Sequence, residues 1–397
     1  MLSVLVESQR ELSVSNIGDG LAQPTRGCIG VRSPSRRWAM PVAAQGSACE
    51  DLTTWGHVLP TSRPAYRDRV ADWTGVGRNT AELYLGMAVR ELRGVSPSYE
   101  ALCRAVAGSE PTCALLDTLP RVKRQPNLLL GAVRFLGGPV DDPASFLIFV
   151  NARWGAVADT MMSHRTQTNE PGRCATLLPL LASLPQPLAL VEVGASAGLC
   201  LYPDRYSYRY TTSLGEHRLG DSEIVLSCAV SGPVPLPGRL PEVVWRAGLD
   251  LNPLQANRDE DRRWLASLVW PEQIDRAERL DRALDLVADD PPRLYAGDLL
   301  VDLPGLLADA PSVATLVVFH SAVLAYLDQK QRSRFTDVMR AVKRTRDVHW
   351  VSNEAPGIIS GADLSPRPHG RFSLAHNRVP VAVTGPHGHS LAWLPDS

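Results

Sequence analysis

The sequence lacks long apolar runs, paired cysteines and an excess of charge of either sign, and each absence excludes a class of protein. No apolar run approaches the ~18 residues that span a bilayer, and no basic segment followed by an apolar one opens the chain. We therefore expect neither export nor a membrane partner. Lys and Arg number 41 against 42 Asp and Glu, so the formal net charge of −1 gives no general attraction for nucleic acid.

The seven cysteines are scattered along the chain, and no C-x-x-C pair suggests zinc or a redox centre. This pattern predicts no metal site and favours a reducing, cytoplasmic location. Hydrophobic residues make up 44% of the 397 residues, which is enough for a large core and for two or three domains.

The pattern of the chain divides it into three parts. Residues 1–76 mix Gly, Pro, Ser and Arg without periodicity and predict a disordered leader. Residues 77–185 show helical spacing of apolar residues, including one long helix over 143–164, and predict an α-helical domain. Over 186–397, strands alternate with helices, which predicts a doubly wound, Rossmann-like α/β domain with a mostly parallel sheet and an inserted hairpin at about residues 202–230.

The stretch Leu188–Leu201 organises this third part, because an apolar strand runs directly into a turn of small residues, Gly194–Gly198. Backbone N–H groups of such a turn can approach a ligand closely. Three known patterns can be compared with its residues. The pattern acid-x-Gly-x-small-x-Gly is matched by Glu192, Gly194, Ser196 and Gly198. As G-x-S-x-G, they make Ser196 a nucleophile. The dinucleotide pattern G-x-G-x-x-G fails, because Ser196 and Leu199 replace two glycines.

Further polar residues follow the later strands. Asp250 ends the strand predicted over 243–250 and is followed by Asn252, and Asp298 ends a short strand that begins at residue 293. An acid at the end of the second strand binds cofactor ribose in doubly wound folds. Glu192 and Asp250 are 58 positions apart, where a simple βαβ unit has about 20, and the inserted hairpin accounts for the excess. His320 and Glu354 follow the next two predicted strands.

Two polar segments interrupt the helical part: Arg124–Asn127 and Arg165–Cys174. The second segment could cap the helix that follows it, with Asn169 as the cap and Pro171 in the first turn. A cap needs one or two polar residues, and this segment has more, so a ligand-facing role is the equal alternative. The candidate substrate-binding residues are Arg165, Thr166, Gln167, Asn169, Glu170 and Arg173.

From residue 79 onward, these segments resemble a bacterial family of uncharacterised, methyltransferase-like proteins. The resemblance is carried by Arg124–Asn127, Arg165–Cys174, Val191–Gly198, Gly248–Pro253 and Val318–Leu327. More distantly, the chain resembles class I S-adenosylmethionine-dependent methyltransferases. That resemblance implies S-adenosylmethionine as cofactor, its methionine end near the Gly194–Gly198 turn, its ribose at Asp250 beside Asn252 and its adenine near Asp298.

Methyl transfer needs alignment and the removal of one proton, because the sulfonium is already activated. His320 is the predicted base and Glu354 the second candidate. The expected function is therefore methyl transfer from S-adenosylmethionine to a small-molecule acceptor, with the oligomeric state left open. Two alternatives remain: a catalytically silent, Rossmann-like binding or regulatory protein, and a serine hydrolase. In the hydrolase, Ser196 would act with Asp250 or Asp298 and with His387 or His389.

Overall fold

The computed structural model describes residues 79–167, 169–361 and 371–395, and the leader predicted over 1–76 lies outside them. The described residues before the first strand are helical. Several of these helices begin at a cap followed by proline: Ser96 accepts a hydrogen bond from Tyr99 N, and Asp142 accepts one from Ser145 N. The helical elements are α1 (Thr80–Met87), the π-helical η2 (Ala88–Leu92), α2 (Pro97–Ala107), α3 (Glu110–Asp117), η3 (Arg121–Lys123), α4 (Pro126–Phe135), α5 (Pro143–Ala152), α6 (Trp154–Ser163), η4 (Pro171–Arg173) and α7 (Cys174–Ser183).

The single helix predicted over 143–164 is wrong, because α5 and α6 are separate. The chain leaves helical geometry at Arg153, with φ −115° and ψ 22°. The buried residues Phe146 and Val150 of α5 and Val157 and Met161 of α6 keep a helical spacing through this break. Apolar periodicity therefore gave no signal for it.

Eleven strands form one sheet in the order β3-β2-β4-β11-β10-β9-β8-β7-β1-β5-β6. The strands are β1 (Leu188–Val193), β2 (Ser207–Thr212), β3 (Gly215–Leu219), β4 (Val225–Ser231), β5 (Val243–Asp250), β6 (Arg293–Ala296), β7 (Thr315–Ser321), β8 (Val348–Glu354), β9 (Phe372–His376), β10 (Val379–Thr384) and β11 (Ser390–Trp393). Between them lie η5 (Leu199–Leu201), α8 (Asp259–Ser267), α9 (Ile274–Asp289), α10 (Leu303–Ala308), η6 (Leu324–Tyr326) and α11 (Gln329–Thr345).

Strands β6, β5, β1, β7 and β8 are mutually parallel, and β9, β10 and β11 continue the sheet as an antiparallel meander. This arrangement confirms the predicted α/β class with a mostly parallel sheet. Strand β1 lies at the centre of the parallel part, between β5 and β7. Apart from the inserted β2, β3 and β4 at the far end of the sheet, the chain places β5 and β6 on one side of β1 before β7 on the other, so the strand order reverses beside β1.

The pairing within the predicted hairpin at residues 202–230 differs from the prediction. β2 forms its antiparallel pair with the short β3, whereas β4 lies on the other side of β2 and parallel to it. β4 also pairs in parallel with β11, which joins the inserted strands to the end of the chain. Alternating side chains identified these strands but not their partners, because alternation is the same in both kinds of pairing.

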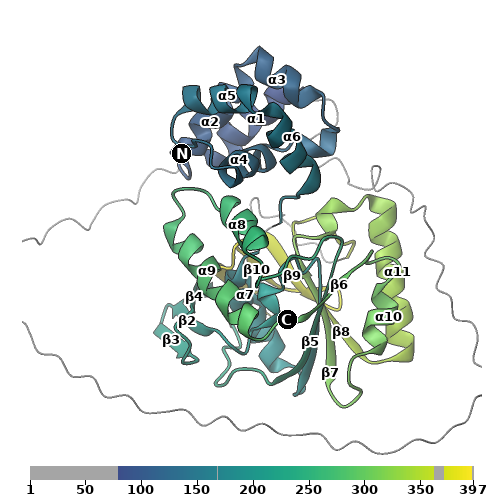
Figure 1. Cartoon of the computed structure of the whole chain (residues 1–397). Helices are drawn as coiled ribbons and strands as arrows, with labels where there is room; N and C mark the ends of the chain where they lie inside the picture. The colour runs from purple at the N-terminus through teal and green to yellow at the C-terminus, as the bar shows by residue number, and fades with distance from the viewer. Residues whose placement is uncertain (1–78, 168, 362–370, 396–397) are drawn as a thin grey trace, which may run out of the picture. The chain divides into compact units, whose positions relative to one another are not determined.

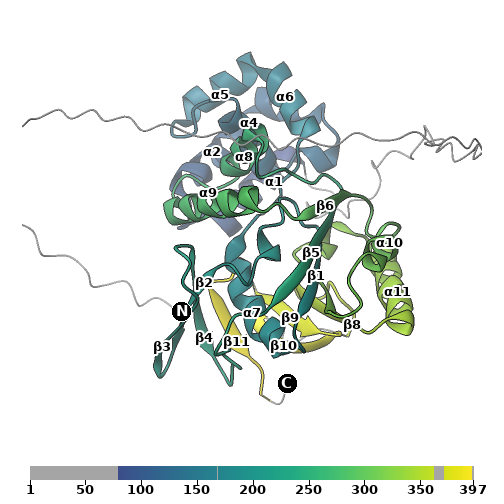
Figure 2. The same cartoon turned by 60° about the horizontal axis from the view of Figure 1, so that its bottom comes forward.

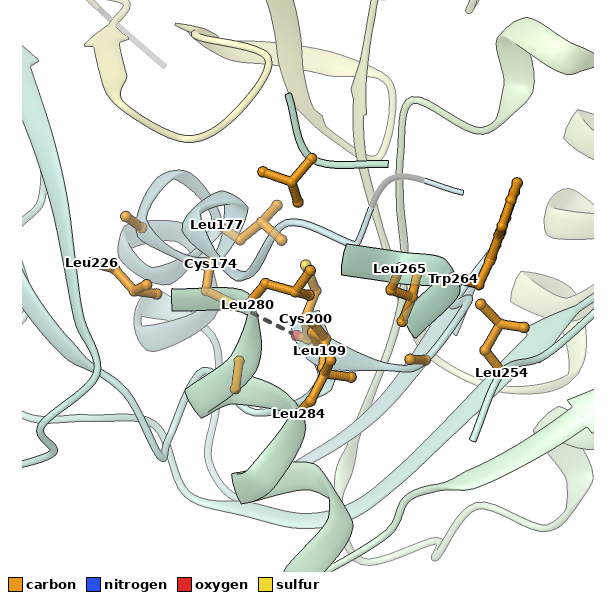
Figure 3. Packing of buried hydrophobic residues seen from close by; sticks show 14 of the residues in the cluster. Cys174, Leu177, Leu199, Cys200, Leu226, Leu254, Trp264, Leu265, Leu280 and Leu284 are labelled. Carbon is orange, nitrogen blue, oxygen red and sulfur yellow. Dashed lines mark hydrogen bonds between the residues drawn. The ribbon is translucent and has the colours of Figure 1, made fainter. Parts of the chain in front are cut away.

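Helices cover both faces of the sheet (Figures 1 and 2). On one face, α10 and α11 pack against β1 residues such as Val191 in a cluster that contains Phe335 and Met339. On the other face, Leu188 and Leu190 join a larger cluster with α7, α8 and α9, part of which is drawn in Figure 3. That larger cluster also includes buried residues of α1 to α6, so the early helices share a core with the sheet.

Within the described parts of the chain, no helix combines the length and the apolar character needed to cross a membrane.

Candidate functional site

A cavity of about 170 Å³ opens where the carboxyl ends of the parallel strands meet the early helices. Loops after β1, β5, β6 and β7 form one wall. Residues from η3, α4 and the segment after α6 form the opposite wall. In doubly wound sheets, ligands bind at this edge, where the strand order reverses. The cavity is lined by Val122, Lys123, Gln125, Leu128, His164–Gln167, Arg173, Val193, Gly194, Ser196, Leu249–Leu251, Gly297–Leu299, Ser321–Val323, Tyr326, Leu327 and Gln331.

The turn after β1 has a left-handed backbone at three alternate residues. Gly194 has φ +74° and Gly198 has φ +75°, a region that glycine enters at little cost. A Cβ at Gly194 would come within 2.4 Å of Val323 Cγ2, so no larger residue fits there. Ser196 adopts φ +51° although it carries a side chain. The serine therefore occupies a position that favours glycine, and neighbouring groups must hold it there.

Asp250 is one of those groups. Its carboxylate accepts hydrogen bonds from Ser196 N at 2.9 Å and from Asn252 N at 2.8 Å, so it joins the end of β5 to the turn after β1. Burial raises the pKa of Asp250, although these two backbone donors and Arg165 oppose the shift. Asp250 lines the cavity, as the sequence predicted from its place at a strand end. Each carboxylate oxygen has two lone pairs, so capacity for ligand hydroxyls remains.

Asn169 and Glu170 do not line the cavity but contact the residues that support it. The Asn169 side chain donates to Ser196 Oγ and accepts from Ala197 N at 3.1 Å. Glu170 is fully buried, with Oε2 2.8 Å from Arg276 Nε and Oε1 3.2 Å from Arg279 Nε. Burial alone would raise the pKa of Glu170, but the two guanidinium groups outweigh it and hold the pKa below its usual range. The contacts of both residues are thus with the scaffold.

The other members of this polar segment face the cavity. Arg165, Thr166, Gln167 and Arg173 all line it. Their contacts join the two walls: Gln167 Nε2 donates to the Asn252 carbonyl at 2.8 Å, and Arg173 Nη1 donates to the Ser321 carbonyl at 3.0 Å. The side-chain oxygen of Gln167 is buried and has no hydrogen-bond partner among the residues that the structure describes. The segment therefore contributes both to the cavity wall and to the support of the glycine turn.

Glu192 lies on β1 directly before the turn and is 7% exposed, but it does not line the cavity. Burial raises the pKa of Glu192 well above its usual range, the Cys200 thiol adds to the shift, and Arg173 opposes it. Within the described part of the chain, Glu192 Oε2 has no hydrogen-bond partner. A buried acid without a full set of partners is costly to a fold, and such residues are frequent at functional sites.

Gly198, Asn252 and Asp298 occupy three different places. Gly198 ends the turn away from the cavity, where a Cβ would come within 2.9 Å of Pro292 Cγ. Asn252 contributes its backbone: its N–H donates to Asp250, and its carbonyl accepts from Gln167. Asp298 lines the cavity after β6 and accepts a hydrogen bond from Leu300 N at 2.9 Å.

His320 and Glu354, the predicted catalytic pair, are buried beneath the cavity and do not line it. His320 is 0% exposed, and both of its ring nitrogens are engaged, Nδ1 with Glu354 Oε1 at 2.7 Å and Nε2 with Trp350 Nε1 at 2.9 Å. A Trp N–H can only donate, so Nε2 accepts and Nδ1 donates. No nitrogen is left to take a proton from a substrate. This geometry argues against the predicted role as base.

Glu354 instead supports the loop after β7. Its Oε1 accepts hydrogen bonds from Val323 N at 2.9 Å and Leu324 N at 3.1 Å, in addition to His320. This loop contains Ala322, a non-glycine residue with φ +58°, and its residues Ser321–Val323 line the cavity. The His320–Glu354 pair therefore positions part of the cavity wall.

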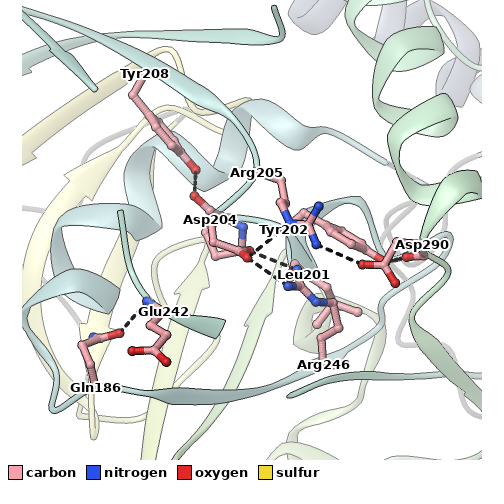
Figure 4. Close-up of polar contacts among 10 residues, drawn as sticks. Gln186, Leu201, Tyr202, Asp204, Arg205, Tyr208, Glu242, Arg246 and Asp290 are labelled. Atoms are coloured by element: carbon pink, nitrogen blue, oxygen red, sulfur yellow. Dashed lines mark hydrogen bonds and ion pairs between the residues drawn. The ribbon is translucent and has the colours of Figure 1, made fainter. Parts of the chain in front are cut away.

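A second anchor holds the chain that leaves the glycine turn (Figure 4). Arg246 of β5 pairs with Asp204 through two contacts of 2.9 and 3.0 Å and donates to the Leu201 carbonyl at 2.9 Å. Its guanidinium lies 4.4 Å from the centre of the Tyr202 ring. These contacts fix η5 against the strand that carries Asp250.

Several cavity residues were not predicted from the sequence. Lys123 Nζ donates to the His164 carbonyl at 2.6 Å, and Gln125 Oε1 accepts from Thr166 Oγ1 at 2.8 Å. Burial lowers the pKa of Lys123 to about 8, and the nearby charge of Arg165 adds to the effect. Tyr326 and Gln331 complete the rim. The sequence signal nearest to these residues was the polar segment Arg124–Asn127, which contains Gln125 and lies next to Lys123.

The contacts of Ser196 bear on the hydrolase alternative. A serine nucleophile needs a base within hydrogen-bond reach of its oxygen. Ser196 Oγ instead meets the Asn169 amide, and Asp250 accepts from the Ser196 backbone. The His387 side chain is exposed, and desolvation together with the nearby charges of Arg276 and Arg173 lowers its pKa to about 4. The described contacts therefore assemble no triad around Ser196.

The chain belongs to a bacterial family described as "Uncharacterized protein conserved in bacteria (DUF2332)", which matches residues 81–393. This match confirms the predicted membership of an uncharacterised bacterial family. A comparison with curated proteins found no match. Among the described residues, no group of three or more His, Cys, Asp or Glu side chains is arranged to hold a metal ion.

Proposed function

We propose that this chain binds S-adenosylmethionine in the cavity beside β1 and transfers its methyl group to a small-molecule acceptor. The observation that carries the proposal is the link between the glycine turn and Asp250, at the edge of a sheet whose parallel strands follow the order β6-β5-β1-β7-β8. With strands counted along the chain, this is the 3-2-1-4-5 order of doubly wound, nucleotide-binding sheets. We accordingly infer that the parallel part is Rossmann-like.

The groups on this wall suit the parts of such a cofactor. Asp250 offers carboxylate oxygens to the ribose hydroxyls, and Asp298 stands at the next strand end, where the adenine amino group would lie. Leu251 and Leu299 supply apolar surface on either side. Glu192 does not line the cavity, so the methionine end of the ligand would contact Gly194, Ser196 and Arg173, which do line it.

The engaged nitrogens of His320 favour a second candidate, a protein that binds the cofactor without turnover. Methyl transfer can proceed largely by alignment of the reactants, so the loss of one predicted base does not decide between the two. A single experiment separates them. The full-length protein is titrated calorimetrically with S-adenosylmethionine and S-adenosylhomocysteine, and is then incubated with methyl-tritiated S-adenosylmethionine and a small-molecule extract of bacterial cells.

We expect micromolar binding, weakened at least tenfold by Asp250→Asn, and transfer of tritium to an extract component. Asp337→Asn, at an exposed acid of α11, is the matched control and should bind as the wild type does. Binding without transfer would support the silent binding protein. No binding of either ligand by the wild type would refute both candidates.

A further inference from the structure

The two walls of the cavity differ in charge. The wall formed by the sheet loops presents the carboxylates Asp250 and Asp298. The wall formed by the early helices presents the cations Lys123 and Arg165, together with Gln125 and no acidic residue. If the cofactor occupies the sheet wall, the helical wall faces the acceptor. The charge of that wall then bears on what the acceptor is.

Lys123 is the most informative residue of the helical wall. It ends η3, is part-buried, and has three ammonium donors, of which the His164 carbonyl takes one. Among the described residues, no carboxylate lies within ion-pair distance of its Nζ. The charged group that acts on the pKa of Lys123 is another cation, Arg165, which disfavours the ammonium form. The charge of Arg165 also lowers the pKa of Asp250, so it acts on the acidic wall as well as on Lys123.

Two other shielded cations are paired with acids, whereas the buried Arg173 donates hydrogen bonds to carbonyl oxygens. The side chain of Arg246 is 12% exposed and meets Asp204, and that of Arg276 is 16% exposed and meets Glu170. Desolvation of a cation is costly unless an anion compensates it. Lys123 and Arg173 both line the cavity without an ion pair to any described carboxylate, and a ligand there can supply the missing negative charge.

We propose that the acceptor is a small molecule with an anionic oxygen group, a carboxylate or a phosphate, held between Lys123 and Arg165. Apolar surface from Val122 and Leu128 flanks this position and suits a hydrophobic body on the same molecule. This inference rests on the proposed function only in calling the bound anion the acceptor. The anion site itself follows from the charges of the wall.

The test measures anion binding by the full-length protein, with benzoate and inorganic phosphate as probes and benzamide as the uncharged counterpart of benzoate. We expect benzoate or phosphate to bind and benzamide to bind at least tenfold more weakly than benzoate. Lys123→Met should abolish the preference, and Lys123→Arg should restore part of it. Lys343→Met is the matched control, because Lys343 is exposed near the end of α11 and does not line the cavity.

A second arm separates an acceptor anion from the carboxylate of the cofactor. S-adenosylhomocysteine carries that carboxylate, and 5′-methylthioadenosine lacks it. If Lys123 holds the acceptor, Lys123→Met leaves the affinity for both nucleosides within twofold of the wild type. A selective loss of S-adenosylhomocysteine binding would overturn the proposal in favour of a cofactor contact. If the wild type binds neither nucleoside, the proposed function fails while the probe titrations still test the anion site.

The wild-type protein gives an independent readout, because its sequence contains only three lysines, Lys123, Lys330 and Lys343. Reductive methylation with ¹³C-formaldehyde labels their amines for NMR and preserves their positive charge. We expect one lysine signal to titrate at about pH 8 and to move to higher pH when benzoate is added. A benzoate-independent titration of all three signals would refute the anion site.

Discussion

Glu170 offers the sharpest test of the difference between scaffold and ligand contact, because its type and position in the sequence predicted a substrate-binding role. In the structure its carboxylate is 0% exposed and lies between Arg276 and Arg279. Glu170→Gln keeps the shape of the side chain and removes its charge. It leaves Arg276 shielded without a counter-ion, and removal of one partner from a buried pair costs about 3–5 kcal/mol. We expect a loss of this size in the free energy of unfolding.

Urea unfolding at pH 7 measures this loss, and helix α9 provides the control. Glu278 is 62% exposed and lies 3.7 Å from Arg282 on the same helix, so Glu278→Gln should change stability by less than about 0.5 kcal/mol. A Glu170→Gln variant as stable as this control would refute the assignment. If it also lost ligand binding at unchanged stability, the original substrate-binding prediction would hold.

The pH dependence supplies a second readout with a definite sign. The folded-state pKa of Glu170 lies below its unfolded value, so its contribution is fully present above the unfolded pKa, about 4.3. The contribution is lost as the pH falls through the folded pKa. The stability difference between wild type and Glu170→Gln should therefore be constant from pH 7 to about pH 5 and shrink below that. A difference that grew on acidification would contradict the ion-pair account.

Three further predictions concern the turn and the loop beside it. For Glu192, burial raises the pKa in the folded state, so the folded state loses stability as the pH rises through that pKa, by up to about 1.4 kcal/mol per pH unit. Glu192→Gln should remove this slope from the free energy of unfolding, measured in urea between pH 5 and pH 8. Wild-type and variant stabilities that change in parallel with pH would argue against this account. Ser196→Gly should be more stable than Ser196→Ala by about 1 kcal/mol. Both variants lose the hydrogen bond from Asn169, and only glycine removes the backbone strain at φ +51°. Equal urea denaturation midpoints for the two variants would contradict this. Glu354→Ala leaves His320 and two backbone donors unpaired and should cost about 2–4 kcal/mol, with a loss below 1 kcal/mol as the opposing result.

The fold could be predicted from the sequence where one local pattern determined the element. The strand predicted over 243–250 is β5, and the apolar strand expected directly before the Gly194–Gly198 turn is β1, which ends at Val193. A sequence pattern that is compatible with two different structures could not decide between them. Apolar spacing continues through the break at Arg153, and alternation in β2 and β4 is the same for parallel and antiparallel partners. These features depend on contacts between segments that are far apart in the sequence.

The strand-end residues of the cavity could be predicted for a geometric reason. Carboxyl ends of parallel strands meet at one edge, so Asp250 and Asp298 had to lie near the turn after β1. At β7 the same reasoning pointed to His320, whereas the residue that lines the cavity is the next one, Ser321. That strand continues to Ser321, and successive side chains point to opposite faces, so Ser321 lines the cavity while His320 is buried against Trp350. The sequence indicated the end of this strand only to within about two residues. An error of one residue is enough to assign a side chain to the wrong face of the sheet.

Lys123 could not be predicted from any spacing, because it lies in a three-residue helix within a basic stretch that resembles an ordinary exposed loop. Its importance arises from what surrounds it: the His164 carbonyl, Arg165 and a cavity wall without an acid. The segment that follows α6 brings these features together. It places Arg165 and Gln167 on the cavity and Asn169 behind the glycine turn. A ligand that draws Lys123 and Arg165 together would therefore act on the same segment that holds Ser196 in its strained conformation, which makes the acceptor wall and the cofactor turn parts of one connected structure.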